Sequence, residues 1–317
     1  MMQVGFIGVG TMGAGMAANL QKAGYRLVVH DARRQVAEPF LAKGATWAAS
    51  PKAVASEAEV VFTSLPGPPE VEAVALGSDG VLAGLRAGGA LFDLSTNSPT
   101  VVRRIHAAFA ERRVHFLDAP VSGGPKGAHS GKLAIWVGGE RAVFDKYKPV
   151  LDAMGDQARY IGAIGAGSVA KLVHNCAGYA VQAALAEVFT LGVKAGVDPV
   201  ALFEAVRQGA GGRRRTFDGL ADQFLSGVYH DPPAFALRLA HKDVSLATGL
   251  GRELKVPMRI AGLALEELTE AMNRGWSERD SRTAMLLQQE RAGVEIKADP
   301  ARIQAVLDAD AAGKGKG

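Results

Sequence analysis

Short apolar runs alternate with longer amphipathic stretches through the first half of the chain. Such runs, bounded by glycine, proline or polar residues, are typical of buried strands in a parallel sheet. We therefore expect strands at residues 4–8, 26–30, 60–63, 90–93, 115–118, 133–137 and 158–161, with helices at 12–23 and 141–153. This alternation predicts an α/β domain with a doubly wound parallel sheet over residues 1–163.

The pattern changes after Ile164. Strand-like runs stop, and apolar residues recur at helical spacing over residues 169–195, 199–208, 217–226, 237–253 and 260–274. An all-α second domain is therefore expected at residues 164–297, joined to the first by a long helix. Residues 298–317 allow one short helix and end in Gly-Lys-Gly-Lys-Gly, so we expect this tail to fray.

Composition supports a two-domain globular protein of 317 residues, because 48% hydrophobic content suffices for two cores. The single cysteine, Cys176, excludes an intrachain disulfide and favours a cytoplasmic setting. The apolar N-terminus lacks a basic leader region and carries regularly spaced glycines, so we interpret it as structure rather than a secretory signal. No apolar run reaches the roughly eighteen residues of a membrane span, so no membrane association is expected.

Charge changes this picture little. The formal net charge is +4, and basic residues are dispersed apart from Arg213–Arg215. We therefore expect no nucleic-acid partner, whereas a small anionic substrate suits a mildly positive protein.

A glycine pattern follows the first expected strand. Gly8, Gly10 and Gly13 form GxGxxG directly before an expected helix. The first glycine permits a tight turn, the second lets the backbone approach a pyrophosphate, and the third lets helix and strand pack closely. The second strand ends at Asp31, where a carboxylate would accept hydrogen bonds from a ribose 2′-hydroxyl. A dinucleotide-binding domain of the Rossmann type is thus predicted.

The choice between NAD and NADP depends on the same region. A carboxylate at Asp31 repels a 2′-phosphate, whereas Arg33 and Arg34 lie close enough in sequence to bind one. The two arginines are equally compatible with a solvated helix start. We expect NAD as the cofactor and leave NADP open.

Three expected strands end in polar tails, at residues 64–67, 94–97 and 119–124, and the first and third of these tails contain both proline and glycine. Ligands of a doubly wound sheet bind beyond the carboxyl ends of its strands, so these tails should line one crevice. Ser122, Gly123 and Gly124 in the third tail can present backbone N–H groups and a hydroxyl to a substrate carboxylate. An ordinary turn that needs positive φ is the alternative interpretation.

Lys171 and Asn175 lie four positions apart at the start of the long expected helix. This spacing puts both side chains on one helical face, where a lysine can donate a proton and an amide can orient it. A solvated surface pair is the alternative.

Six segments together resemble one family. They are GFIGVGTMGAGMAANL at residues 5–20, SLP at 64–66, DLSTNSP at 93–99, FLDAPVSGG at 116–124, GAGSVAKLVHN at 165–175 and HKD at 241–243. In this order they resemble the 3-hydroxyacid (β-hydroxyacid) dehydrogenases, which include 3-hydroxyisobutyrate dehydrogenases and tartronate semialdehyde reductases.

The resemblance implies roles for individual residues and a homodimer or homotetramer assembled through the helical domains. It implies no metal. Catalysis is implied for Lys171 and Asn175, and substrate binding for Ser122, Gly123, Gly124, Phe235 and Asp243. Cofactor binding is assigned to Gly8, Gly10, Thr11, Met12, Gly13, Asp31, Leu65, Pro66, Thr96 and Lys242. The chain departs from the family at Arg213–Arg215, and Arg213 becomes a candidate for a second anionic group of the substrate.

The activity implied is hydride transfer between NAD(P) and a small 3-hydroxy acid or its semialdehyde, with Lys171 as general acid and base. The alternatives left open are reduction of tartronate, succinic or glyoxylic semialdehyde-type substrates with NADPH, and a non-catalytic nucleotide-binding homologue. Imine reductases of this superfamily usually lack the lysine. Larger 6-phosphogluconate dehydrogenases need a longer helical domain.

Overall fold

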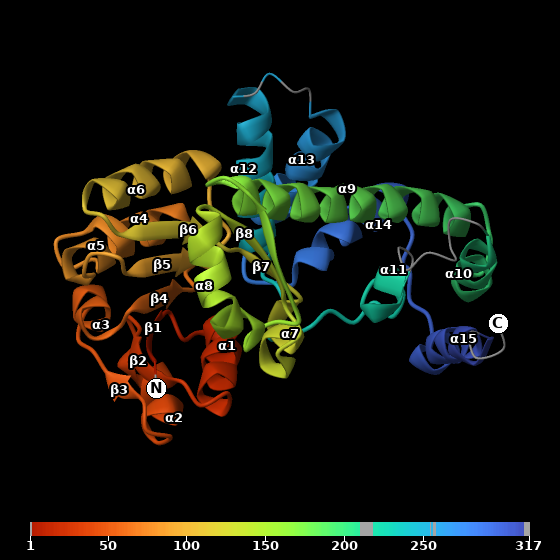
Figure 1. Cartoon of the computed structure of the whole chain (residues 1–317). Coiled ribbons are helices and arrows are strands. Elements are labelled where there is room, and N and C mark those ends of the chain that lie inside the picture. The colour runs from red at the N-terminus through yellow and green to blue at the C-terminus, as the bar shows by residue number, and fades with distance from the viewer. Residues whose placement is uncertain (1, 210–217, 254, 256–257, 314–317) are drawn as a thin grey trace. The chain divides into compact units, whose positions relative to one another are not determined.

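The computed structural model describes residues 2–209, 218–253, 255 and 258–313 (Figure 1). Contacts divide the chain into two compact units, Met1–His174 and Asn175–Gly317. This division falls inside the long helix α9 (Ala166–Lys194), whereas the domain boundary expected from the sequence precedes that helix.

The first unit is built on one nine-stranded sheet in the order β3-β2-β1-β4-β5-β6-β8-β7, with β9 paired to β8. Pairing from β3 to β6 is parallel, β8 is antiparallel to β6 and β7, and β9 is parallel to β8. The strands are β1 (Gln3–Ile7), β2 (Arg26–His30), β3 (Thr46–Trp47), β4 (Val60–Thr63), β5 (Ala90–Asp93), β6 (His115–Asp118), β7 (Val121–Ser122), β8 (Ala134–Gly138) and β9 (Gln157–Gly162). The doubly wound Rossmann-type sheet expected from the sequence is therefore confirmed.

The order of the strands reverses between β1 and β4. Gly5 of β1 pairs in register with Val28 of β2 on one side and Val61 of β4 on the other. The chain passes from β1 to β2 toward one edge of the sheet and from β4 to β5 toward the other edge. A crevice therefore opens beyond the carboxyl ends of β1 and β4, and ligands of such sheets bind there. The glycine turn after β1 lies at this point.

Helices cover both faces of the sheet (Figure 1). The core on one face contains Phe6, Phe62 and Phe92 in a row across the sheet, and Tyr147 of α8 packs edge-on against Phe92 at 5.8 Å between ring centroids. The helices on this face are α1 (Thr11–Lys22), α7 (Gly124–Ser130) and α8 (Arg141–Asp152). Those on the other face are α3 (Pro51–Glu57), α4 (Pro68–Leu76), α5 (Val81–Gly84) and α6 (Pro99–Glu111). The 3-10 turn Arg34–Ala37 and α2 (Glu38–Leu41) join β2 to β3.

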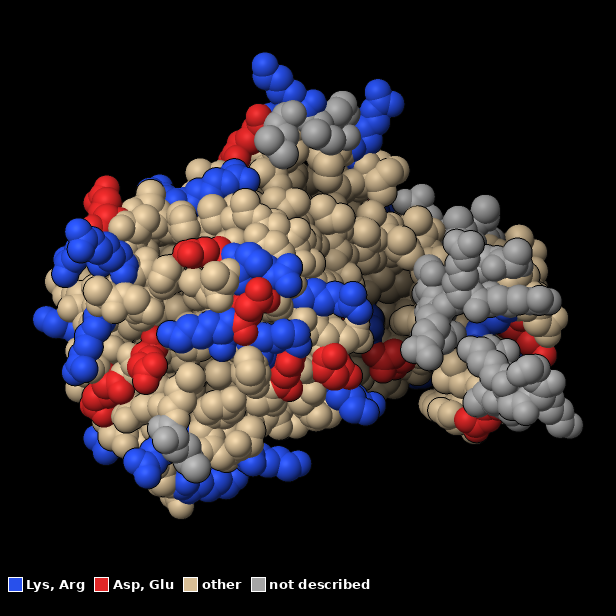
Figure 2. Space-filling view, viewed as in Figure 1, with Lys and Arg blue, Asp and Glu red and all other residues tan. Residues whose placement is uncertain are grey.

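Acidic and basic side chains are intermixed on the face of the first unit seen in Figure 2. On α8 the pairs Arg141–Asp145 and Lys148–Asp152 are exposed i,i+4 ion pairs. Exposed pairs of this kind contribute at most about 0.5 kcal/mol each. The small net positive charge is thus spread rather than gathered on this face.

The regular elements that the structure describes in the second unit are all helical. They are the remainder of α9, α10 (Pro199–Gln208), α11 (Asp218–Asp222), α12 (Leu237–Glu253), α13 (Arg259–Asn273), the 3-10 turn η3 (Ser281–Met285), α14 (Leu286–Ala292) and α15 (Pro300–Gly313). One buried cluster contains Phe189, Phe203 and Phe224, and a second contains Leu237 and Leu268.

The short helix that the sequence allowed in the C-terminal tail is α15, and Ile303 of this helix is buried in the first of these clusters. Residues 314–317 lie outside the described part of the chain. Within the described residues, none of the helices is both long and apolar enough to cross a membrane.

Candidate active site

The glycine turn closes tightly after β1. Gly8 has a φ of +88°, and a Cβ on Gly13 would lie 1.8 Å from the Gly8 carbonyl oxygen, so neither position accommodates a side chain. A Cβ on Gly10 would meet only the Arg33 guanidinium, at 3.8 Å, within contact distance. The turn is therefore packed against the protein at its first and third glycines and open at the second, which fits a pyrophosphate at the start of α1.

Asp31 is held against this turn at the end of β2. Its carboxylate oxygens accept hydrogen bonds from the backbone N–H groups of Val9 and Arg33, each at 2.9 Å. A carboxylate has about four acceptor positions, so it keeps capacity for a ribose hydroxyl. Arg34 contacts the Trp47 ring at 5.5 Å and lies 3.9 Å from Glu38.

A buried carboxylate that the sequence analysis missed connects the tails of β4 and β5. Asp93 is fully buried and accepts hydrogen bonds from Thr63 Oγ1 at 3.0 Å, the Ser95 backbone N–H at 3.1 Å and Asn97 Nδ2 at 3.0 Å. Burial raises the pKa of Asp93, and these hydrogen bonds oppose the rise.

The same network reaches the next tail, because Ser95 Oγ accepts the Leu65 backbone N–H at 2.9 Å. The two tails that carry Leu65, Pro66 and Thr96 are thus fixed to each other. Asp93 is recognisable in the sequence as an acidic residue at a strand end followed by Leu-Ser-Thr-Asn, a tail that we had assigned to the crevice without giving Asp93 a role.

The Ser-Gly-Gly segment makes a turn that requires glycine. Gly123 has a φ of +137° and Gly124 a φ of +60°. A Cβ on Gly123 would also lie 3.0 Å from Leu133 Cδ2. Ser122 itself is in the short strand β7, which the sequence analysis did not predict, and pairs with Ala134 of β8. The turn with positive φ, given above as the alternative, is therefore present, and it leaves the serine hydroxyl on a rigid strand.

Asp118 fixes the start of α9 and was also missed. It is buried at the end of β6, and its oxygens accept the backbone N–H of Gly165 at 2.7 Å and of Ser168 at 2.6 Å. Burial raises the pKa of Asp118, against the effect of these hydrogen bonds. The helix packs closely here, since a Cβ on Gly167 would lie 2.2 Å from the Trp136 carbonyl oxygen. A carboxylate at a helix N-terminus satisfies free N–H groups and complements the helix dipole.

Lys171 follows less than one turn after this cap and belongs to the first unit. His174, three residues further along the same helix, lies 3.1 Å through Nε2 from Ser122 Oγ, and its ring contacts Trp136 at 5.1 Å between centroids. Partial burial and the positive charge of Lys171 lower the pKa of His174. The structure thus places the Ser-Gly-Gly turn against the part of α9 that carries Lys171. We had given His174 no role, although it lies within the segment GAGSVAKLVHN.

Other predicted residues belong to the second unit. Asn175 Nδ2 donates to Asp243 Oδ2 at 2.5 Å, and Lys242 Nζ lies 2.9 Å from Asp243 Oδ1. Asp243 is buried and therefore orients both neighbours. Phe235 stacks on Tyr179 at 6.5 Å between ring centroids. Burial raises the pKa of Tyr179 far above its ordinary range.

The remaining features singled out in the sequence are the arginine cluster and the cysteine. Arg213, with Arg214 and Arg215, lies outside the described residues. Cys176 follows Asn175 on α9, is buried, and has a thiol pKa raised by burial.

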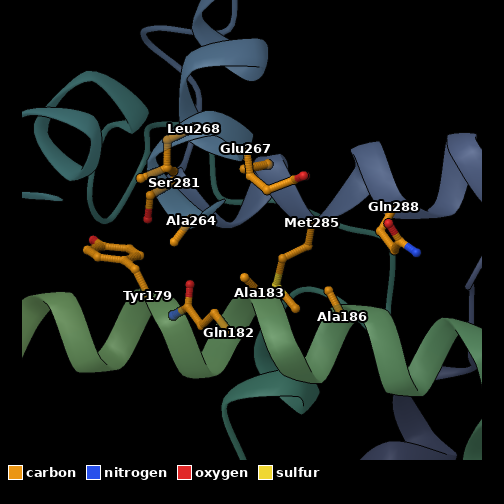
Figure 3. A pocket seen from close by; sticks show the side chains of 11 residues that line it. Tyr179, Gln182, Ala183, Ala186, Ala264, Glu267, Leu268, Ser281, Met285 and Gln288 are labelled. Atoms are coloured by element: carbon orange, nitrogen blue, oxygen red, sulfur yellow. The ribbon is translucent and has the colours of Figure 1, made fainter. Parts of the chain in front are cut away.

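A separate cavity lies within the second unit, between α9, α13 and η3 (Figure 3). Tyr179 and Gln182 of α9 face Ala264 and Ser281 across it. Its volume of about 40 Å³ holds roughly three waters at about 10–15 Å³ each, which is far too little for a dinucleotide. Its lining contains none of the residues predicted to bind substrate or cofactor.

Two family models match this chain. A family model described as the NAD binding domain of 6-phosphogluconate dehydrogenase matches residues 3–162. A second model, described as NAD-binding of NADP-dependent 3-hydroxyisobutyrate dehydrogenase, matches residues 165–288.

Several known proteins are also similar to this chain over most of its length. The 2-(hydroxymethyl)glutarate dehydrogenase of Eubacterium barkeri is 35% identical over 295 residues, covering 93% of this chain and 97% of that protein. The NAD-dependent L-serine dehydrogenase of Pseudomonas aeruginosa is 37% identical over 290 residues, covering 88% and 95%. A structure of Mycobacterium tuberculosis 3-hydroxyisobutyrate dehydrogenase with L-serine aligns with a TM-score of 0.81 at 29% identity, covering 90% of this chain and 99% of that one.

Proposed function

The chain belongs to the 3-hydroxyacid dehydrogenase family of NAD(P)-dependent oxidoreductases, and from this premise we propose that it interconverts a small 3-hydroxy acid and its semialdehyde, with Lys171 as general acid and base. The observation that carries the proposal is the 3.1 Å contact between Ser122 Oγ and His174 Nε2. His174 and Lys171 are three residues apart on α9, so they lie on neighbouring positions of one helical face. A carboxylate bound at Ser122 would therefore lie close to the lysine.

The charge that develops on the substrate oxygen indicates the separate roles of the cofactor and Lys171. The cofactor, when bound, supplies or accepts the hydride. In the direction of reduction, an alkoxide develops on the substrate oxygen, and the Lys171 ammonium stabilises this charge and donates the proton. In the direction of oxidation, the neutral amine takes the proton from the hydroxyl. The capped start of α9 holds the lysine in place for both steps.

The Ser-Gly-Gly turn indicates how the substrate is oriented. Ser122 and the backbone beside Gly123 and Gly124 bind the carboxylate end, and the hydroxyl or aldehyde carbon then lies toward Lys171. Of the relatives named above, the acids 3-hydroxyisobutyrate, L-serine and 2-(hydroxymethyl)glutarate share a hydroxymethyl carbon next to a carbon that bears a carboxylate. We propose a substrate with this arrangement.

For the cofactor, we propose that NAD is preferred over NADP. Asp31 presents its negative charge beside the glycine turn, where it repels a 2′-phosphate and accepts a bond from a 2′-hydroxyl. Arg34, one of two cations that would favour NADP, already contacts Trp47 and Glu38.

The first prediction tests the lysine. We expect Lys171→Ala to lower kcat at least about 100-fold, because general acid–base help is lost, while leaving the Kd of NADH nearly unchanged. Steady-state rates with NAD⁺ and NADP⁺ on the three acids named above, and with NADH and NADPH on the matching semialdehydes, provide the measurement.

Lys148→Ala is the matched control, since this lysine lies in an exposed ion pair on α8. Near-normal turnover of Lys171→Ala would refute the role of the lysine. A preference for tartronate, succinic or glyoxylic semialdehyde in the same panel would keep the mechanism and change the substrate.

A further inference from the structure

We propose that His174 positions the Ser122 hydroxyl for the substrate carboxylate and takes up a proton when that carboxylate binds. This inference rests on the proposed function, because it assigns Ser122 to the carboxylate. His174 acts here as a positioning residue, through Ser122.

The geometry fixes the imidazole from two sides. Its Nε2 lies 3.1 Å from Ser122 Oγ, and its ring packs at 5.1 Å against Trp136. Trp136 belongs to β8, and Ser122 belongs to β7, which pairs with β8 in register through Ala134. The hydroxyl and the ring therefore face each other from elements that are tied together.

The protonation state of His174 Nε2 decides whether the Ser122 hydroxyl can donate a hydrogen bond to a ligand. A hydroxyl has one proton to donate. If Nε2 is unprotonated, Ser122 donates to it and presents only oxygen lone pairs to a ligand. If Nε2 carries a proton, it donates to Ser122 Oγ, and the hydroxyl proton is free to bind a carboxylate. An anionic ligand therefore selects the Nε2–H form of His174.

Among Nε2–H forms, the doubly protonated imidazolium also contributes a positive charge. Without ligand, the charged group that acts on His174 is Lys171, on its own helix, and Ser122 and Trp136 face it from β7 and β8. Partial burial and Lys171 lower the pKa of His174 below the ordinary value of 6.5, so the ring is neutral at pH 7. A bound carboxylate adds a negative charge that offsets Lys171 and raises this pKa.

The sign of the pH effect follows by linkage. Because the ligand raises the pKa, the complex holds more protons than the free protein at pH values between the two pKa values. Affinity for the carboxylate therefore increases as pH falls through the pKa of the complex, and becomes constant below the pKa of the free protein. Each unit of difference corresponds to a tenfold change in Kd.

The test uses the full-length protein with NADH and 3-hydroxyisobutyrate, a combination that cannot turn over. The His174 imidazole signal is identified in the NMR spectrum by its loss in His174→Gln, and its pKa is measured with and without the acid. We expect the acid to raise that pKa by about one unit, and Kd from calorimetry to tighten about tenfold from pH 8 to a pH below the measured pKa of the free protein.

Variants separate positioning from simple structural support. His174→Gln keeps an N–H donor for Ser122 near the position of Nε2 that does not titrate, so it should bind the acid with a Kd that is independent of pH. His174→Ala should bind about tenfold more weakly, and also without pH dependence. His106→Asn is the matched control, because this histidine lies on α6 and contacts the Phe116 carbonyl oxygen instead, and it should keep the wild-type slope.

The result that overturns the inference is a His174 pKa that the acid does not move, or a pH dependence of Kd that persists in His174→Gln. Failure of the proposed function is distinguishable from this result. If the protein binds the acid with the expected pKa change but Lys171→Ala retains turnover, the reaction assignment fails and the inference on His174 stands.

Discussion

Asp31 combines two tasks in one side chain. It accepts the backbone N–H groups of Val9 and Arg33, and so shapes the glycine turn. The same carboxylate is our candidate ligand for the ribose. We therefore propose that its charge both holds the glycine turn and selects NAD over NADP. The second role predicts different effects of a substitution on the binding of the two cofactors.

We expect Asp31→Ala to weaken NADH binding about tenfold, because a hydrogen bond between a carboxylate and a ribose hydroxyl is lost. NADPH should lose less or gain, because the repulsion of its 2′-phosphate is removed. Fluorescence titration of both reduced cofactors measures the ratio of their Kd values. Asp152→Ala, in an exposed pair on α8, is the control, and an unchanged ratio in Asp31→Ala would remove Asp31 from cofactor selection.

Individual residues differ in how far the sequence predicted them. Gly8, Gly13, Gly123 and Gly124 were predictable because a turn motif states a backbone requirement. Asp118 was not, since its partners, Gly165 and Ser168, are about fifty positions away and only the fold brings them together. The binding roles given to these residues stay predictions.

At the scale of elements, the connection between β6 and α9 matters most. Asp118 at the end of the strand caps the helix that carries Lys171 and His174. The capping residue therefore positions the start of the helix that carries both groups.

Asp118→Ala should lower the free energy of unfolding by about 2–4 kcal/mol, because two backbone N–H groups lose a buried acceptor. It should also reduce kcat, because the first turn of α9 shifts with Lys171. Chemical denaturation and steady-state kinetics measure the two effects.

Asp198→Ala is the matched control, because Asp198 caps α10 through Val200 and Ala201 at an exposed position. It should lower the free energy of unfolding less than Asp118→Ala does and leave kcat unchanged. Equal loss of turnover in both variants would show that Asp118 acts only on general stability.

The strands of four or more residues were predicted to within one residue at each end, since each carries a clear apolar run. The helices α8, α10, α12 and α13 were predicted as closely, whereas shorter helices such as α4 and α7, and also α6, were given no bounds. The strands β3 and β7 were not, because each has only two residues and shows no period. Contacts beyond the local sequence define such short strands.

At the scale of the whole molecule, the second unit exposes apolar side chains on α13. Ile260 and Leu263 are 58% and 57% exposed and lie three positions apart, on one face of the helix. Such a face is typical of an interface. We expect the protein to form a homodimer or homotetramer that buries these residues.

The double variant Ile260→Glu, Leu263→Glu should lower the mass of the particle by a factor of two or more, measured by light scattering at micromolar concentration. Val228→Glu, at another exposed apolar residue of the second unit, should leave the mass unchanged. A monomeric wild-type protein would contradict this expectation.

Cys176 offers a practical consequence. The chain contains one cysteine, and it is buried with a raised thiol pKa, so little reactive thiolate is present at neutral pH. Maleimide dyes should therefore attach selectively to a cysteine introduced at an exposed position. Two such positions, one in each unit, would give a fluorescence ruler for the motions of this enzyme during turnover, with the natural thiol left in place.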